Sequence, residues 1–173
     1  MSAIRGRLSD LPAERARHHD GNGERGSGGL YLKAYLPDVN IWLALSDPAH
    51  AAHEQATEWL LGSHGARLLL CPVTEAGFVR IAASPLVGKK TIADAMRMLE
   101  EIAALPNVAH LPVSFSWLEL IQPLIPRLHG YRQVTDALLL GLAIRNEAIL
   151  VTLDRSMQAL AGEAYAANLL TLA

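Results

Sequence analysis

The sequence predicts an α/β domain: an open, doubly wound parallel sheet of about five short strands with helices on both faces. Three observations lead to this fold class. Short, almost wholly apolar runs, such as residues 67–71 and 148–152, alternate with longer segments whose apolar residues recur at helical spacing. Strands that are apolar on both faces are typical of a parallel sheet buried between two helical layers. Glycine and proline mark many of the segment boundaries.

The apolar runs have the length and composition of buried strands. Pro37 breaks the first near its end, and the second is bounded by Gly65 and Pro72. The expected strands are residues 34–38, 67–71, 108–111, 148–152 and 168–172.

Amphipathic segments separate these strands. Residues 135–146 show a strong helical pattern, with Thr135 as the expected N-cap. Pro123 and Pro126 interrupt residues 115–128 and predict one or two short helices there. The other expected helices are residues 40–45, 51–61, 74–82, 91–104 and 155–161. We expect right-handed crossovers between successive strands.

Length, charge and cysteine content limit the class of protein. The chain has 173 residues, 51% of them hydrophobic, which suits one compact domain with its own core. A net charge of −2 excludes a globally basic protein that coats nucleic acid. The single cysteine, Cys71, excludes a disulfide framework and a cysteine-rich zinc module. Because no apolar run reaches about 18 residues and no secretory signal follows Met1, we expect a cytoplasmic protein without a membrane span.

Composition changes near residue 33. Residues 20–29 are rich in glycine and charge and have little to bury, which is typical of a flexible linker. Residues 10–19 have the pattern of a short helix. We therefore expect residues 1–33 to form a flexible N-terminal extension and residues 34–173 to form the single folded domain.

Acidic residues follow three of the expected strands. Asp38, Glu75 and Asp154 come after the first, second and fourth strands, and Asp136 opens the helix before the fourth. In an open parallel sheet, ligands bind beyond the carboxyl ends of the strands, so one cleft can collect all four acids. Each acid alone is also what a helix start commonly holds, because it complements the positive end of the helix dipole.

Four carboxylates at one edge repel one another. At about 5 Å and an effective dielectric constant of about 20, each pair costs about 3 kcal/mol. A bound cation or a shared proton relieves this repulsion. Oxygen-only ligands favour Mg²⁺ or Mn²⁺, and such an ion activates water and stabilises charge on a phosphodiester under attack.

Three further side chains are candidates to support the acids. Asn40 and Thr152 lie beside them in the sequence and are candidates to orient carboxylates or waters. Arg80, on the helix that carries Glu75, is a candidate to pair with a carboxylate or to contact a phosphate.

These motifs resemble PIN domains, and specifically the VapC-type ribonuclease toxins of bacterial toxin–antitoxin pairs. The resemblance spans residues 34 to about 172, and it is specific because several short motifs occur in the right order and spacing. The matching segments are Asp38-Val39-Asn40 with Trp42-Leu43-Ala44-Leu45, the His50 and His53 segment after Asp47-Pro48, Thr74-Glu75-Ala76, Thr135-Asp136-Ala137-Leu138-Leu139 and Leu150-Val151-Thr152-Leu153-Asp154.

The resemblance implies a Mg²⁺- or Mn²⁺-dependent endonuclease that cuts single-stranded RNA, forms a homodimer and is inhibited by a cognate antitoxin. Carried over by position, Asp38, Glu75, Asp136 and Asp154 become the metal-binding and catalytic acids. The chain departs from the family pattern in its N-terminal extension and in Met157, where an aromatic residue is frequent.

Two other functions fit an acidic cleft. A haloacid-dehalogenase-like phosphatase also uses an aspartate at a strand end, but it needs a second acid two residues on, where this chain has Asn40, and a well-placed lysine. A non-catalytic acidic-cleft binding module is the other alternative.

Overall fold

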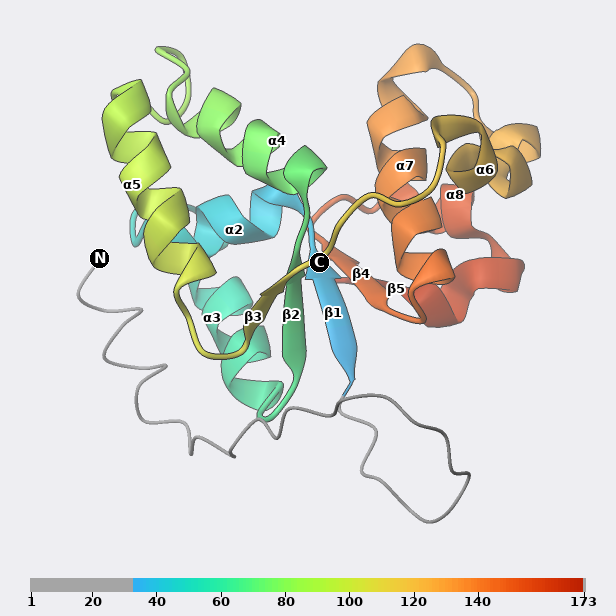
Figure 1. Cartoon of the computed structure of the whole chain (residues 1–173), viewed down its shortest axis with the longest axis horizontal. Helices are drawn as coiled ribbons and strands as arrows, with labels where there is room; N and C mark the ends of the chain where they lie inside the picture. Colours follow the sequence, from blue (N-terminus) through green and yellow to red (C-terminus); the bar gives the residue numbers. More distant parts are fainter. Residues whose placement is uncertain (1–32, 173) are drawn as a thin grey trace.

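The central feature of the structure, a computed structural model that describes residues 33–172, is a five-stranded parallel sheet (Figure 1). The strand order is β3-β2-β1-β4-β5, and every neighbouring pair is parallel. The strands are β1 (Ala34–Pro37), β2 (Arg67–Leu70), β3 (Val108–His110), β4 (Ile149–Thr152) and β5 (Leu169–Thr171). The chain builds outward from β1 to β3 and then returns to place β4 on the other side of β1. The predicted α/β fold is confirmed.

Helices cover both faces of this sheet. In Figure 1, α2–α5 lie on one side of the strands and α6–α8 lie on the other. The helices are α2 (Val39–Ser46), α3 (His53–Gly62), α4 (Pro72–Ala82), α5 (Ile92–Ala103), α6 (Trp117–Ile121), α7 (Val134–Arg145) and α8 (Met157–Ala161). Shorter 3₁₀ turns are η1 (Gln122–Arg127), η2 (Tyr131–Gln133) and η3 (Glu163–Asn168).

Successive side chains along each strand belong alternately to two hydrophobic cores, one on each face of the sheet. Tyr35, Leu68 and Leu70 belong to the core under α2–α5, whereas Leu36 and Leu69 belong to the core under α6–α8. Side chains of successive strand residues point to opposite faces, so a strand that is apolar throughout feeds both cores. Full burial of each such leucine contributes about 1.5–3 kcal/mol to folding.

Two close contacts between helices require glycine. A Cβ atom on Gly77 of α4 would lie 2.6 Å from Val39 Cγ2 at the start of α2. A Cβ atom on Gly141 of α7 would lie 2.3 Å from the carbonyl oxygen of Leu120. Glycine at these positions therefore lets α4 pack closely on α2 and α7 pack closely on α6.

One predicted helix cap is wrong. Helix α7 begins at Val134, and its N-cap position is taken by Gln133, which makes no side-chain cap hydrogen bond. Thr135 lies inside the helix because η2 runs directly into α7 and leaves no extended residue at the start. Elsewhere the helices and strands begin and end within two residues of their expected bounds, and residues 115–128 form α6 and η1, as their prolines predict.

The predicted N-terminal extension and the helix expected at residues 10–19 lie outside the described residues, apart from Lys33, which is exposed. Within the described range, no helix combines the length and apolar character that crossing a membrane requires.

We propose that residues 34–173 are a self-sufficient domain. Deleting residues 1–30 is expected to leave the melting temperature unchanged, because both cores described here are built from residues 34–172. Thermal denaturation followed by circular dichroism measures this. As a control, deleting residues 1–37 also removes β1, which pairs with β2 and β4, and cooperative unfolding should be lost. A clear fall in melting temperature for the shorter deletion would contradict the domain boundary.

Candidate active site

Asp38 lies where β1 passes into α2 and accepts three hydrogen bonds. Its Oδ1 accepts from the Val39 backbone N–H at 2.6 Å. Its Oδ2 accepts from Asn40 Nδ2 at 2.7 Å and from the Thr152 hydroxyl at 2.9 Å. Asp38 is the N-cap of α2, but two of its three donors are side chains that do not belong to a helix cap. These contacts hold the carboxylate in one position.

Asn40 and Thr152 join the ends of the two central strands. Asn40 Nδ2 lies 2.9 Å from Thr152 Oγ1, and Asn40 Oδ1 accepts a hydrogen bond from the Leu153 backbone N–H at 3.1 Å. Thr152 Oγ1 accepts from the Asp154 backbone N–H at 3.1 Å. The same small network therefore positions Asp38 after β1 and the backbone that carries Asp154 after β4.

Asp136 and Asp154 complete an electrostatic cluster with Asp38. Burial, followed by the negative charges of Asp38 and Asp154, raises the pKa of Asp136 from 3.8 to about 6. The pKa of Asp38 is also raised, mainly by burial and in part by Asp154, against the lowering effect of its hydrogen bonds. The structure thus brings together three of the four predicted acids, from the ends of β1 and β4 and the first turn of α7.

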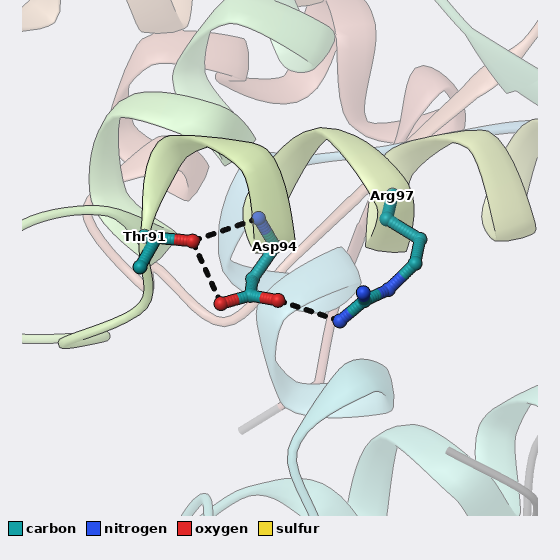
Figure 2. Close-up of polar contacts among 3 residues, drawn as sticks. All are labelled: Thr91, Asp94 and Arg97. Atoms are coloured by element: carbon teal, nitrogen blue, oxygen red, sulfur yellow. Dashed lines mark hydrogen bonds and ion pairs between the residues drawn. The ribbon is translucent and has the colours of Figure 1, made fainter.

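A different acid in a first helix turn shows what a purely structural role looks like. Asp94 of α5 accepts hydrogen bonds from the Thr91 hydroxyl at 2.7 Å and from Arg97 Nη2 at 2.6 Å (Figure 2). These interactions, led by the bond from Thr91, lower the pKa of Asp94. Asp136 occupies the same kind of position in α7 and has a raised pKa, so helix capping does not account for it.

Glu75 stands apart from this cluster. It lies in the first turn of α4, and its Oε1 is 3.5 Å from Nδ1 of His110 at the end of β3. Its charge makes no contribution to the raised pKa of Asp38 or Asp136. His110 was missed by the sequence analysis, although it ends a strand at the same edge of the sheet as the acids.

Comparisons with known proteins agree with this geometry. A family model described as "PIN domain" matches residues 35–163. Ribonuclease VapC38 of Mycobacterium tuberculosis is 40% identical over 128 residues, which cover 73% of this chain and 89% of the relative. Ribonuclease VapC44 of the same organism is 34% identical over 123 residues, which cover 70% of this chain and 87% of the relative. This chain belongs to the PIN-domain family, among the VapC ribonucleases.

A solved structure shares the PIN-domain fold. It is a crystal structure of VapBC2 from Rickettsia felis bound to a DNA fragment from its promoter. The TM-score is 0.52 at 17% sequence identity, and the match covers 73% of this chain and 92% of that chain. At this identity the comparison supports the fold alone.

The donor set of this PIN domain suits a divalent cation. Asp38, Asp136 and Asp154 offer only oxygen atoms, and a nearby positive charge would offset the repulsion that helps to raise the pKa values of Asp38 and Asp136. Within residues 33–172, no three Asp, Glu, His or Cys side chains are grouped so that together they could hold a metal ion. A complete cage is not required for Mg²⁺, which is usually held by one or two carboxylates and keeps several waters.

Arg80 does not make one of its two expected contacts. It is exposed in the last turn of α4 and forms no ion pair with any residue of the described range. Its expected contact with a phosphate stays a prediction.

Replacing Asp136 with Asn is expected to stabilise the metal-free protein in a pH-dependent way. The folded protein keeps a proton on Asp136 up to about pH 6, whereas the unfolded chain loses it near the ordinary value of 3.8. The ionised carboxylate therefore destabilises the fold as pH rises through this window, and the penalty is fully present above it. Asp136→Asn should raise the melting temperature in EDTA at about pH 7.5 and change it little at about pH 4.

Thermal melts at the two pH values test this expectation. Glu58→Gln is a suitable control, because Glu58 is an exposed acid on α3. A melting temperature that falls at the higher pH, or rises equally at both, would show that Asp136 carries no such penalty.

Proposed function

We propose that this chain is a divalent-metal-dependent endoribonuclease and the toxin of a bacterial toxin–antitoxin pair. The observation that carries the proposal is the convergence of Asp38, Asp136 and Asp154 where β1 and β4 end side by side. Membership among the VapC ribonucleases supports the same activity, because the relatives are named as ribonucleases.

We propose that Asp38, Glu75, Asp136 and Asp154 hold Mg²⁺ or Mn²⁺. When bound, the ion supplies an activated water and stabilises the charge that develops on the phosphodiester. The residues of the chain orient this chemistry. Thr152 and Asn40 fix the carboxylate of Asp38, and a bound cation would favour the ionised form of Asp136, whose pKa is about 6 in the metal-free protein.

We propose RNA as the substrate, a cognate antitoxin protein as the inhibitor, and a homodimer in the cytoplasm as the working assembly. A protein partner needs an accessible apolar surface, and α6 offers one. Trp117 is 56% exposed and Leu118 is 64% exposed. Either an antitoxin or a second copy would remove this surface from water.

The phosphatase alternative is less well supported by the site. Its second acid would stand at position 40, where Asn40 instead donates a hydrogen bond to Asp38. An amide at this position cannot act as a general acid. The binding-module alternative differs from the ribonuclease in predicting no cleavage of RNA.

Replacing Asp38 with Asn should abolish cleavage of single-stranded RNA in Mn²⁺. Loss of a ligand charge removes several kcal/mol of transition-state stabilisation, which corresponds to a rate loss of about 100-fold or more. Gel analysis of a labelled RNA measures cleavage. Asp47→Asn, in an exposed acid that follows α2, is the matched control and should cleave like the wild type. Cleavage at the wild-type rate by Asp38→Asn, or none by the wild type, would refute the proposed activity.

Mn²⁺ should raise the melting temperature of the wild-type chain. An ion that binds only the folded state stabilises it by about 2.7 kcal/mol when its concentration is about 100 times the dissociation constant. Asp154→Asn should reduce the rise, because its charge acts on both other aspartates. Differential scanning fluorimetry measures both shifts. A wild-type chain whose melting temperature does not respond to millimolar Mn²⁺ would rule out the proposed cation site.

A further inference from the structure

His110 lies beside Glu75 because of the way β3 pairs with β2. His110 is opposite Leu70 in the register of the two strands, and the Leu111 backbone N–H donates to the Leu70 carbonyl at 2.8 Å. Two residues after Leu70 the chain enters α4, and Glu75 stands in its first turn. The end of β3 therefore adjoins the first turn of α4, and His110 Nδ1 comes to 3.5 Å from Glu75 Oε1.

Glu75 has far fewer restraints than Asp38. Three donors hold the carboxylate of Asp38, whereas within residues 33–172 His110 is the one side chain in polar contact with that of Glu75. A glutamate also has one more rotatable bond than an aspartate, and fixing such a side chain costs up to about 2 kcal/mol of conformational entropy. The imidazole of His110 is thus the group available to limit where this carboxylate lies.

The contact leaves the second oxygen of Glu75 available. In the described residues no hydrogen bond or ion pair reaches Oε2, and the Glu75 side chain keeps 29% of its surface accessible. The distance of 3.5 Å is longer than a good hydrogen bond, but such contacts in free enzymes often tighten only when the ligand is bound. One oxygen can therefore be held by His110 while the other serves the site.

We propose that His110 is a positioning residue that holds Glu75 Oε1 and so leaves Oε2 free to bind the metal. This inference rests on the proposed function. His110 acts through the N–H at Nδ1. Carboxylate ligands are commonly oriented by such an outer partner, and its loss costs about 10- to 100-fold in metal affinity or activity.

Mn²⁺ binding to the full chain, measured by isothermal titration calorimetry, tests this role without relying on catalysis. His110→Ala should weaken binding by about 10- to 100-fold. His110→Asn should restore most of the affinity, because its amide can place an N–H close to the position of Nδ1. His64→Ala is the matched control, since His64 is exposed in the turn between α3 and β2. Equal loss in His110→Ala and His110→Asn would overturn the proposal.

A double-mutant cycle decides whether His110 acts through Glu75. In a Glu75→Gln background, His110→Ala should cause little further loss of Mn²⁺ affinity, because the group it positions is already altered. Losses that add would overturn the inference. Circular dichroism melts establish that each variant is folded.

RNA cleavage kinetics provide the second measurement. His110→Ala should lower kcat with little change in KM, whereas a raised KM with unchanged Mn²⁺ affinity would mean direct contact with RNA and would overturn the positioning role. If the wild type neither binds Mn²⁺ nor cleaves RNA, the proposed function fails. If the wild type does both and His110→Ala matches it, this inference alone fails.

Discussion

Parallel pairing of β1 with β4 is the constraint on which the rest of the site depends. These neighbouring strands come from opposite halves of the chain, and they end at the same edge because they run in the same direction. The residues that follow them, Asp38 and Asp154, are therefore close in space although they are more than a hundred positions apart. The Asn40–Thr152 network ties the two ends together. Burial of Leu36 and Leu150 against the helices offsets the repulsion that this arrangement creates.

The environment of an acid, more than its place in a helix, decides what it does. Asp94 and Asp136 both stand in the first turn of a helix, yet their pKa values move in opposite directions. Asp94 is exposed to solvent and bonded to Thr91 and Arg97, which stabilise its charge. Asp136 is partly buried and faces two like charges, which destabilise its own. A group whose charge is destabilised by burial and by like charges is one whose charge a cation would stabilise, and this contrast with Asp94 supports the proposed metal site.

Most of the fold could be predicted because its signals are local. The apolar runs locate the strands, and Pro123 and Pro126 divide the segment after β3 into α6 and η1. The N-cap of α7 could not be predicted in the same way. Thr135 has the chemistry of a cap, but the preceding η2 turn already directs the chain into the helix, so the cap position falls earlier, on Gln133. Local preference for a cap gives way when the upstream backbone is already helical.

The sequence by itself determined the kind of fold, the family resemblance and the four acids that follow or adjoin strand ends. Apolar periodicity locates the strands, and ligands bind beyond the carboxyl ends of parallel strands, so neither inference requires knowledge of distant contacts. Only the tertiary structure decided how these acids are grouped. It couples Asp38, Asp136 and Asp154 and sets Glu75 beside His110. The physical reason is that strand order and register, which arise from the packing of the whole sheet, determine which strand ends are neighbours. No local pattern around residue 110 shows that β3 will lie next to the start of α4.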